Sequence, residues 1–282
     1  MTYSKSDKSY DIRRIRQQSI KGQLWSKAHP GYAAERMRRR RELYGREPKE
    51  IIKETFNPLV FKSDLCGVIS DLHIPFQNKN FVDVMYTTMK KYKVKDLAIV
   101  GDFWDCDNYT RFVRLSWGES FKEEINHVKD ELNRIVHNFK NVWICRGNHE
   151  KRWIDGNNGM MGMKELFNCT GIIEGYEVTL DDHMILKSGD RIWLLCHPRN
   201  FRQTPLSVAR DLATKYNMNV ICAHGHGFAS GWDKSGKYYC IDSGGLFDKE
   251  ALEYLRNTTC YPETRNGFII IKDGEPMLFY GD

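Results

Sequence analysis

Apolar residues come in short runs along most of the chain, and longer amphipathic stretches separate these runs. The short runs predict buried strands, whereas apolar residues that recur every three or four positions predict helices packed on those strands. We predict helices over 80–93 and 119–139. The predicted strands span 65–70, 97–100, 142–145, 192–196, 220–223, 238–241, 268–271 and 277–279.

The order of these elements indicates an α/β fold. Strands that alternate with helices are typical of a parallel sheet, and the later strands, joined by short turns containing glycine, favour an antiparallel portion. The chain has 282 residues, 41% of them hydrophobic, which is enough to bury a large core.

Nothing in the pattern predicts association with a membrane. No stretch approaches the roughly 18 consecutive apolar residues of a membrane span, and the N-terminal MTYSKSDKSYDIRRIR lacks the apolar segment of a signal peptide. The eight cysteines include no C-x-x-C pair, so we expect reduced thiols rather than a disulfide framework. We therefore expect a cytoplasmic protein.

Positive charge is concentrated at the N-terminus. Residues 1–56 hold 15 Lys and Arg against 7 Asp and Glu, which leaves 28 against 30 in the remainder. The first segment thus carries +8 and the rest −2. Weak helical periodicity at 11–25 and 32–44 predicts a basic, helical arm over 1–58, ahead of a catalytic domain over 59–282. The arm's densest cluster is a candidate contact for nucleic acid through Arg38, Arg39, Arg40 and Arg41. The alternative is a solvated charged helix.

Polar residues capable of binding metal follow five of the predicted strands. In open α/β sheets, ligands bind outside the carboxyl ends of the strands, so we expect these loops to converge. Two aspartates, an asparagine and four histidines are too many donors for one tetrahedral ion, but they fit two ions that share a carboxylate. Carboxylate and imidazole donors without thiolate suit Mn²⁺, Fe or Zn²⁺. The candidate ligands are Asp71, His73, Asp102, Asn148, His197, His224 and His226.

These residues form the ordered set D-x-H, G-D-x-x-D, G-N-H-E, H and H-x-H between residue 65 and about residue 246. The set resembles that of the calcineurin-like metallophosphoesterase superfamily, and SDLHIPF is most similar to its bacterial and phage members. The resemblance implies a mixed β-sandwich flanked by helices in four layers. It also implies that Asp102 bridges two ions, one held with Asp71, His73 and His226, and the other with Asn148, His197 and His224.

The resemblance further implies catalytic roles for the residues of the RGNHE segment. His149, the imidazole not used for metal, is expected to protonate the leaving group, and Asp105 is expected to orient it. Arg146 is expected to bind a phosphate oxygen, because a guanidinium matches phosphate geometry. One departure concerns the substrate: Cys106 and Asp107 stand where the Ser/Thr protein phosphatases of this superfamily carry an Arg-Gly pair.

We therefore predict a hydrolase that uses two divalent ions, Mn²⁺ first and Fe, Zn²⁺ or Ni²⁺ as alternatives, to hydrolyse phosphate esters with activated water. The favoured substrate is a nucleic-acid phosphodiester, so that the enzyme would be a nuclease or phosphodiesterase. The alternative is a phosphomonoesterase acting on a phosphoprotein or a small nucleotide. A binding scaffold without turnover is disfavoured, because buried carboxylates and imidazoles are costly to hold together without metal. The sequence predicts no oligomeric state.

Overall fold

The computed structural model describes residues 57–110, 120–173, 176–252 and 263–281. The predicted basic arm, including Arg38 to Arg41 and its two helical stretches, lies outside the described residues. No described helix is long and apolar enough to cross a bilayer.

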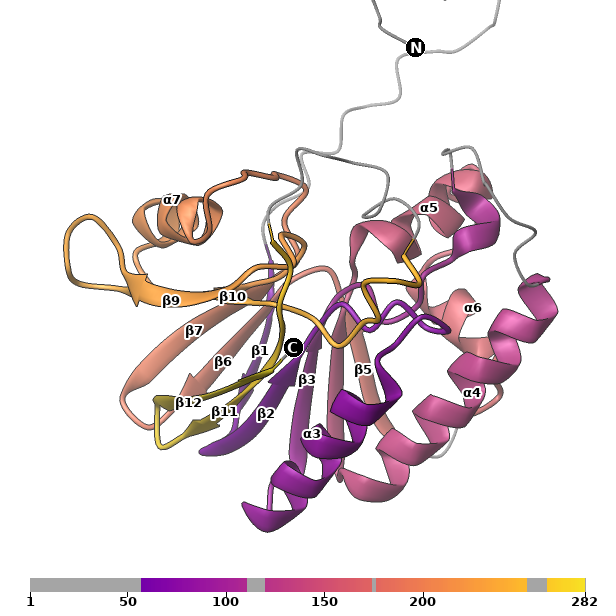
Figure 1. The fold of residues 1–282 in the computed structure, drawn as a ribbon, viewed down its shortest axis with the longest axis horizontal. Helices are drawn as coiled ribbons and strands as arrows, with labels where there is room; N and C mark the ends of the chain where they lie inside the picture. Colours follow the sequence, from indigo (N-terminus) through magenta and orange to yellow (C-terminus); the bar gives the residue numbers. More distant parts are fainter. Residues whose placement is uncertain (1–56, 111–119, 174–175, 253–262, 282) are drawn as a thin grey trace, which may run out of the picture. The chain divides into compact units, whose positions relative to one another are not determined.

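Two mixed sheets of six strands each, counted over the described ranges, face one another (Figure 1). In the first sheet, β2 to β5 run parallel, β11 pairs antiparallel with β2, and β12 pairs antiparallel with β11. Its spatial order is β12 (Glu275–Gly281), β11 (Asn266–Lys272), β2 (Leu65–Ile69), β3 (Asp96–Val100), β4 (Asn141–Cys145) and β5 (Glu177–Asp181). The second sheet has the order β1 (Leu59–Lys62), β6 (Met184–Ser188), β7 (Arg191–Cys196), β8 (Asn219–Cys222), β10 (Tyr239–Ser243) and β9 (Phe228–Trp232).

Helices cover the outer face of each sheet (Figure 1). Four lie on the first sheet: α3 (Lys79–Lys91), α4 (Phe121–Asn138), α5 (Asn148–Gly156) and α6 (Met163–Asn168). One helix, α7 (Ser207–Tyr216), packs on the second sheet, and a short 3₁₀ helix, η1 (Asp107–Tyr109), follows β3. Both predicted helices are present, and each begins at a side-chain cap: Asn78 accepts from the Phe81 N–H, and Ser120 forms a capping box with Glu123.

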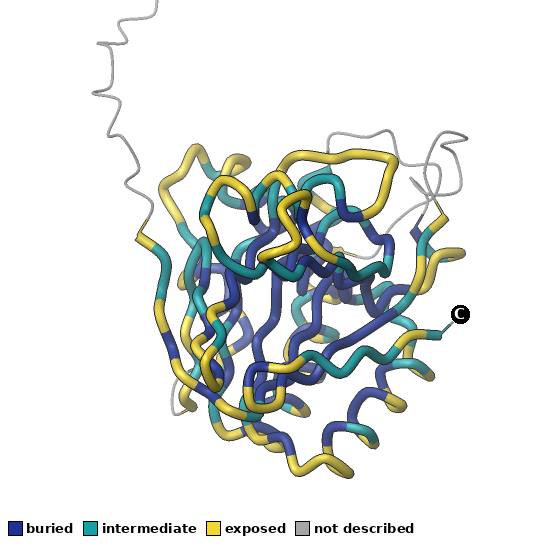
Figure 2. Tube along the Cα trace, turned by 90° about the vertical axis from the view of Figure 1, so that its left-hand side faces the viewer, coloured by how far each residue is buried: buried dark blue, intermediate teal, exposed yellow. Residues whose placement is uncertain are grey.

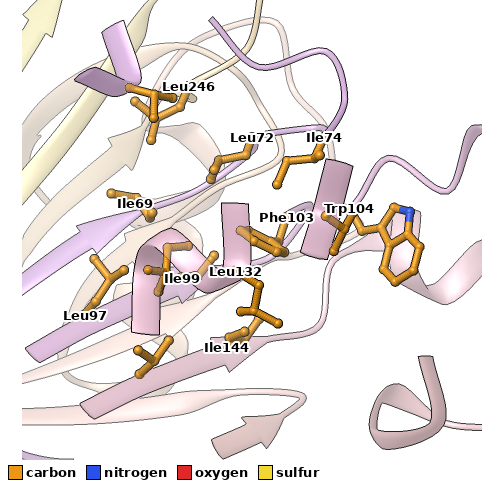
Figure 3. Close-up of a cluster of buried hydrophobic side chains, with 14 of the residues drawn as sticks. Ile69, Leu72, Ile74, Leu97, Ile99, Phe103, Trp104, Leu132, Ile144 and Leu246 are labelled. Atoms are coloured by element: carbon orange, nitrogen blue, oxygen red, sulfur yellow. The ribbon is translucent and has the colours of Figure 1, made fainter. Parts of the chain in front are cut away.

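Alternation along the strands explains the layers. In β3, Leu97 and Ile99 pack against the helices, whereas Ala98 and Val100 point into the core between the sheets. A third apolar cluster joins α7 to β7, β8 and β10. The deeply buried positions follow the strands (Figure 2), and Figure 3 shows how Leu132 of α4 lies among side chains of the first sheet. The predicted four-layer sandwich is confirmed.

All eight predicted strands are present, but four strands and three helices were missed. Among the missed strands, β5 is only partly buried, so its residues do not form an apolar run. The missed helix α5 begins inside the polar RGNHE segment, where apolar periodicity gives no signal. The complete set of missed elements is β1, β5, β6, β9, α5, α6 and α7.

Candidate metal centre

The loops that follow five strands meet at one edge of the sandwich. The strands β2, β3 and β4 are parallel neighbours in one sheet, and β7 and β8 are parallel neighbours in the other. Backbone bonds join the first two loops directly: the Asp71 N–H donates to Gly101 at 3.0 Å, and the His73 N–H donates to Asp102 at 3.0 Å. Side chains separated by more than 150 positions in the sequence, such as Asp71 and His226, are therefore neighbours.

The first group of donors consists of Asp71, His73 and His226. Asp71 Oδ1 lies 3.1 Å from His226 Nε2 and 3.8 Å from His73 Nε2, and the two imidazole nitrogens are 3.2 Å apart. All three side chains are buried. Three donor atoms that face one another at these distances are arranged as ligands around a common point.

The second group consists of Asp102, His197 and His224, with Asn148 beside them. His197 Nε2 lies 3.0 Å from Asp102 Oδ2 and 3.0 Å from Asn148 Oδ1. His197 Nδ1 lies 2.9 Å from the carbonyl oxygen of Val100, which fixes the ring with Nε2 toward the carboxylate. Asn148 and His224 are half-buried, so this group is nearer to solvent than the first.

Asp102 stands between the two groups. Its Oδ2 atom is 3.9 Å from His73 Nε2 of the first group and 3.0 Å from His197 Nε2 of the second. Burial alone would raise the pKa of this carboxyl group, but the nearby His149 and His197 hold it well below the usual range. Asp102 is therefore an anion placed to touch both groups.

The donor set fits divalent cations. Among the described residues, no hydrogen bond of normal geometry reaches the buried Asp71 Oδ1 and Asp102 Oδ2 atoms, which lie 3.1 Å from His226 Nε2 and 3.0 Å from His197 Nε2. A cation between these atoms would offset the cost of burying the carboxylates. The pKa of Asp71 is lowered, since His226 and His73 outweigh the effect of burial. That of His224 is lowered to about 4, because the ring is desolvated and lies near His197. Imidazole, carboxylate and amide donors suit Mn²⁺, Fe, Zn²⁺ or Ni²⁺.

The backbone at these ligands is strained. Five of them have positive φ, a conformation that residues other than glycine rarely adopt. Such strain persists only where the surrounding structure fixes it, and here the inter-loop hydrogen bonds do so. The φ values are 49° at Asp71, 49° at His73, 47° at Asp102, 78° at His224 and 55° at His226.

Two glycines make room for the ligands. A Cβ on Gly101, whose φ is +76°, would lie 2.5 Å from His197 Nδ1. A Cβ on Gly147 would lie 2.1 Å from Asp102 Oδ1 and 2.3 Å from the Asp102 backbone nitrogen. Close packing against the candidate ligands therefore leaves no room for a side chain at Gly101 or Gly147.

We expect Gly147→Ala to destabilise the protein by about 1–3 kcal/mol, because the loop must move away from Asp102 to admit the methyl group. Gly162→Ala is the matched control: Gly162 caps α6 with Glu165 as Gly147 caps α5 with Glu150, but its Cβ would meet nothing closer than Glu165 Oε2 at 3.4 Å. The free energy of unfolding in urea measures both effects. Equal losses in the two variants would show that Gly147 is not needed for close packing.

Glu150 is a site residue to which the sequence assigned no chemistry. Its buried carboxylate accepts from the backbone N–H groups of Gly147 at 2.8 Å, Asp102 at 3.2 Å and Trp104 at 2.9 Å. Glu150 thus ties the loop after β3 to the loop after β4. The carboxylate stabilises the backbone of Asp102 without touching the donor groups, and only the three-dimensional structure identifies this contact.

His149 and Asp105 lie together beside Asp102. His149 Nδ1 is 2.9 Å from Asp105 Oδ1 and 2.8 Å from the Asp105 carbonyl oxygen, and its Nε2 is 3.8 Å from Asp102 Oδ2. Asp105 Oδ1 is also 2.7 Å from His73 Nδ1. The carboxylate raises the pKa of His73 to about 10, although burial alone would lower it. Asp105 therefore contacts both a candidate ligand and the candidate proton donor.

Two arginines belong to the same segment. Arg146, which the sequence analysis expects to bind phosphate, donates from Nη2 to Asp182 Oδ2 at 2.7 Å. The charge of its guanidinium is therefore already balanced by a carboxylate. Arg152 was missed, and its Nη1 lies 3.0 Å from His149 Nδ1. Residues three apart share a face of a helix, but the sequence predicted no helix there.

A family model and several solved structures resemble this chain. The family model for calcineurin-like phosphoesterases matches residues 66–258. No curated protein matches the chain significantly. Solved structures that it resembles include an archaeal phosphodiesterase (15% identity, 77% of this chain and 99% of that one, TM-score 0.43). Another is Zn²⁺-complexed Vps29 from Entamoeba histolytica (14% identity, 77% of this chain and 91% of that one, TM-score 0.42). A third is the phosphoesterase Yfce from E. coli (13% identity, 76% of this chain and 98% of that one, TM-score 0.41).

The family model covers more than half of the chain, including every candidate ligand from Asp71 to His226. Groups of buried carboxylates and imidazoles stand where divalent metals can bind. The chain belongs to the calcineurin-like phosphoesterase family, and it is a metal-binding hydrolase that acts on phosphate esters.

Proposed function

We propose that the chain is a dinuclear phosphoesterase whose two ions share Asp102. The observation that carries this proposal is the position of Asp102 Oδ2, which is buried and lies 3.9 Å from His73 Nε2 of one donor group and 3.0 Å from His197 Nε2 of the other. Asp71, His73 and His226 would complete one site; Asn148, His197 and His224 would complete the other. When bound, the two cations supply Lewis-acid activation of water and of the phosphate ester.

His149 and Asp105 would protonate the leaving group. His149 stands beside the donor groups, with Nε2 facing Asp102 and Nδ1 held by Asp105. A donor in that position can give its Nε2 proton to the departing alkoxide, while Asp105 keeps the ring in place and stabilises the imidazolium form. The chemistry needs no nucleophilic side chain.

A nucleic-acid phosphodiester is the substrate that we favour. Apart from the basic arm, the support comes from the loop between β7 and α7, which follows His197. There the exposed Phe201 places its ring 6.4 Å from that of His224, edge to face. Arg199 and Arg202 are exposed on the same loop, and Arg202 also forms a surface ion pair with Asp211 at 3.1 Å. An aromatic ring flanked by cations is typical of surfaces that stack bases and attract the phosphate backbone. We propose Mn²⁺ as the metal, because the donor groups contain no thiolate.

The substrate class is tested by comparing bis- and mono-nitrophenyl phosphate with oligonucleotides and plasmid DNA, after chelation and readdition of Mn²⁺. We expect preference for the diester and cleavage of nucleic acid. Preference for the monoester, with intact DNA and RNA, would select the phosphomonoesterase. No metal-dependent hydrolysis of any of these esters would contradict the dinuclear proposal.

The contribution of the arm is tested in the full-length protein. Replacing Arg38, Arg39, Arg40 and Arg41 with glutamine should lower the slope of log affinity against log salt for DNA by up to about 3, since each lost phosphate contact lowers it by about 0.7–0.9. Hydrolysis of the nitrophenyl ester should not change.

The matched control is replacement of four exposed lysines, Lys90, Lys91, Lys93 and Lys95, with glutamine. They lie at the end of α3 and in the turn to β3, which is the edge of the sheet opposite to the metal centre. If both sets of substitutions lower the slope equally, the arm has no specific role in binding DNA.

A further inference from the structure

Arg152 is placed beside the candidate proton donor. It lies on α5, one turn beyond His149, and its Nη1 atom is 3.0 Å from His149 Nδ1. The opposite nitrogen of the same ring, Nε2, is 3.8 Å from Asp102 Oδ2. The guanidinium of Arg152 is therefore separated from the bridging carboxylate by one imidazole ring.

The charge of Arg152 is uncompensated within the described part of the chain. No described carboxylate lies within the 4.0 Å of an ion pair, although the residue is half-buried. Two nearby cationic residues, in contrast, each have a carboxylate partner: Arg146 donates to Asp182 at 2.7 Å, and Lys151 donates to Asp155 at 2.6 Å. A partly desolvated guanidinium without a counter-ion is costly, and an anion that binds there offsets this cost.

The contact with His149 does not satisfy the guanidinium. An arginine side chain only donates hydrogen bonds, and it carries five N–H groups. His149 Nδ1 already faces two acceptors of Asp105, the carboxylate Oδ1 at 2.9 Å and the carbonyl oxygen at 2.8 Å. When His149 Nδ1 carries a proton and donates it to Asp105, this nitrogen has no lone pair that could accept a hydrogen bond from Arg152. The N–H groups of Arg152 are then available to an acceptor at the site.

The geometry points to Arg152 as the residue that binds a non-bridging oxygen of the substrate phosphate. The planar guanidinium can donate two parallel hydrogen bonds to such a group. Arg146, the sequence-based candidate, is instead held by Asp182. The inference rests on the dinuclear site proposed above, since that site places the phosphate next to His149.

The test uses the full-length, Mn²⁺-loaded protein with inorganic phosphate and bis-nitrophenyl phosphate as probes. Arg152→Ala should weaken phosphate binding, measured by calorimetry, by about 10- to 100-fold, which is the range for a charge-assisted hydrogen bond. Lys151→Ala, the neighbouring loss of one positive charge on α5, should change it less than twofold. Arg152→Lys, which keeps the charge but not the planar fork, should be intermediate. Guanidinium ions at millimolar concentration should partly restore hydrolysis by Arg152→Ala.

The outcomes distinguish phosphate binding by Arg152 from an indirect effect through His149. Phosphate affinity that is unchanged in Arg152→Ala overturns the inference. A loss of hydrolysis confined to esters with poor leaving groups, at unchanged phosphate affinity, also overturns it and shows that Arg152 acts only through His149. If the wild-type protein binds two Mn²⁺ ions and phosphate, a failure belongs to Arg152 alone; if it binds neither, the dinuclear site fails and the inference falls with it.

Discussion

Replacing Asp102 with alanine is expected to lower kcat for bis-nitrophenyl phosphate by at least about 1,000-fold. The physical reason is that one buried carboxylate oxygen faces imidazoles of both donor groups. Its removal deprives each proposed site of an anionic ligand, and paired ions contribute several kcal/mol to the transition state, at about 1.4 kcal/mol for each factor of ten.

The experiment must separate metal loss from misfolding. Metal content by mass spectrometry should fall from two ions per chain to one or none, while the circular dichroism spectrum stays the same. Asp130→Ala, which removes an exposed carboxylate from α4, is the control for the change in net charge and should retain wild-type activity. Wild-type turnover by Asp102→Ala, with both ions bound, would show that Asp102 is not the bridge.

The second large effect is expected at His149, and it depends on the substrate. His149→Ala should slow hydrolysis of a dialkyl phosphate diester, from which an alkoxide must leave, by about 10²- to 10⁴-fold, the usual contribution of a general acid. Loss of nitrophenolate should be slowed far less, because this leaving group is stable without a proton. The basis is the position of His149 Nε2, 3.8 Å from Asp102 Oδ2, with Nδ1 held by Asp105.

The measurement is a plot of log kcat against the pKa of the leaving group. The slope should steepen in His149→Ala, and it should stay at the wild-type value in the control His137→Ala, which removes an exposed histidine of α4. Parallel lines for His149→Ala and the wild-type protein would exclude His149 as the proton donor, whatever the absolute loss.

Much of the fold could be predicted because the chain marks its buried strands with apolar runs. The ends of β2, β3, β4, β7 and β8 each carry a polar motif, and parallel strands bring such ends to one edge. That rule is enough to expect Asp71 and His226 near one another. The resemblance to a known family added the four-layer arrangement, which apolar periodicity alone does not specify.

The parts that escaped prediction depend on contacts between loops. The strand β5 is half-buried at the sheet edge, so its sequence EVTLD has no continuous apolar run. The helix α5 begins with the polar residues NHEKR, which give no apolar periodicity. Without that helix, the sequence does not show that Arg152 lies against His149, or that Glu150 reaches the backbone of Asp102.

The carboxylate of Asp105 lies within hydrogen-bond distance of the rings of both His73 and His149. In the mechanism that we propose, proton donation by His149 and metal binding by His73 both depend on this carboxylate, so a change at Asp105 is expected to disturb both. A kinetic defect in Asp105→Asn is consequently the product of two losses. Only a comparison with single changes at His73 and at His149 would divide it between them.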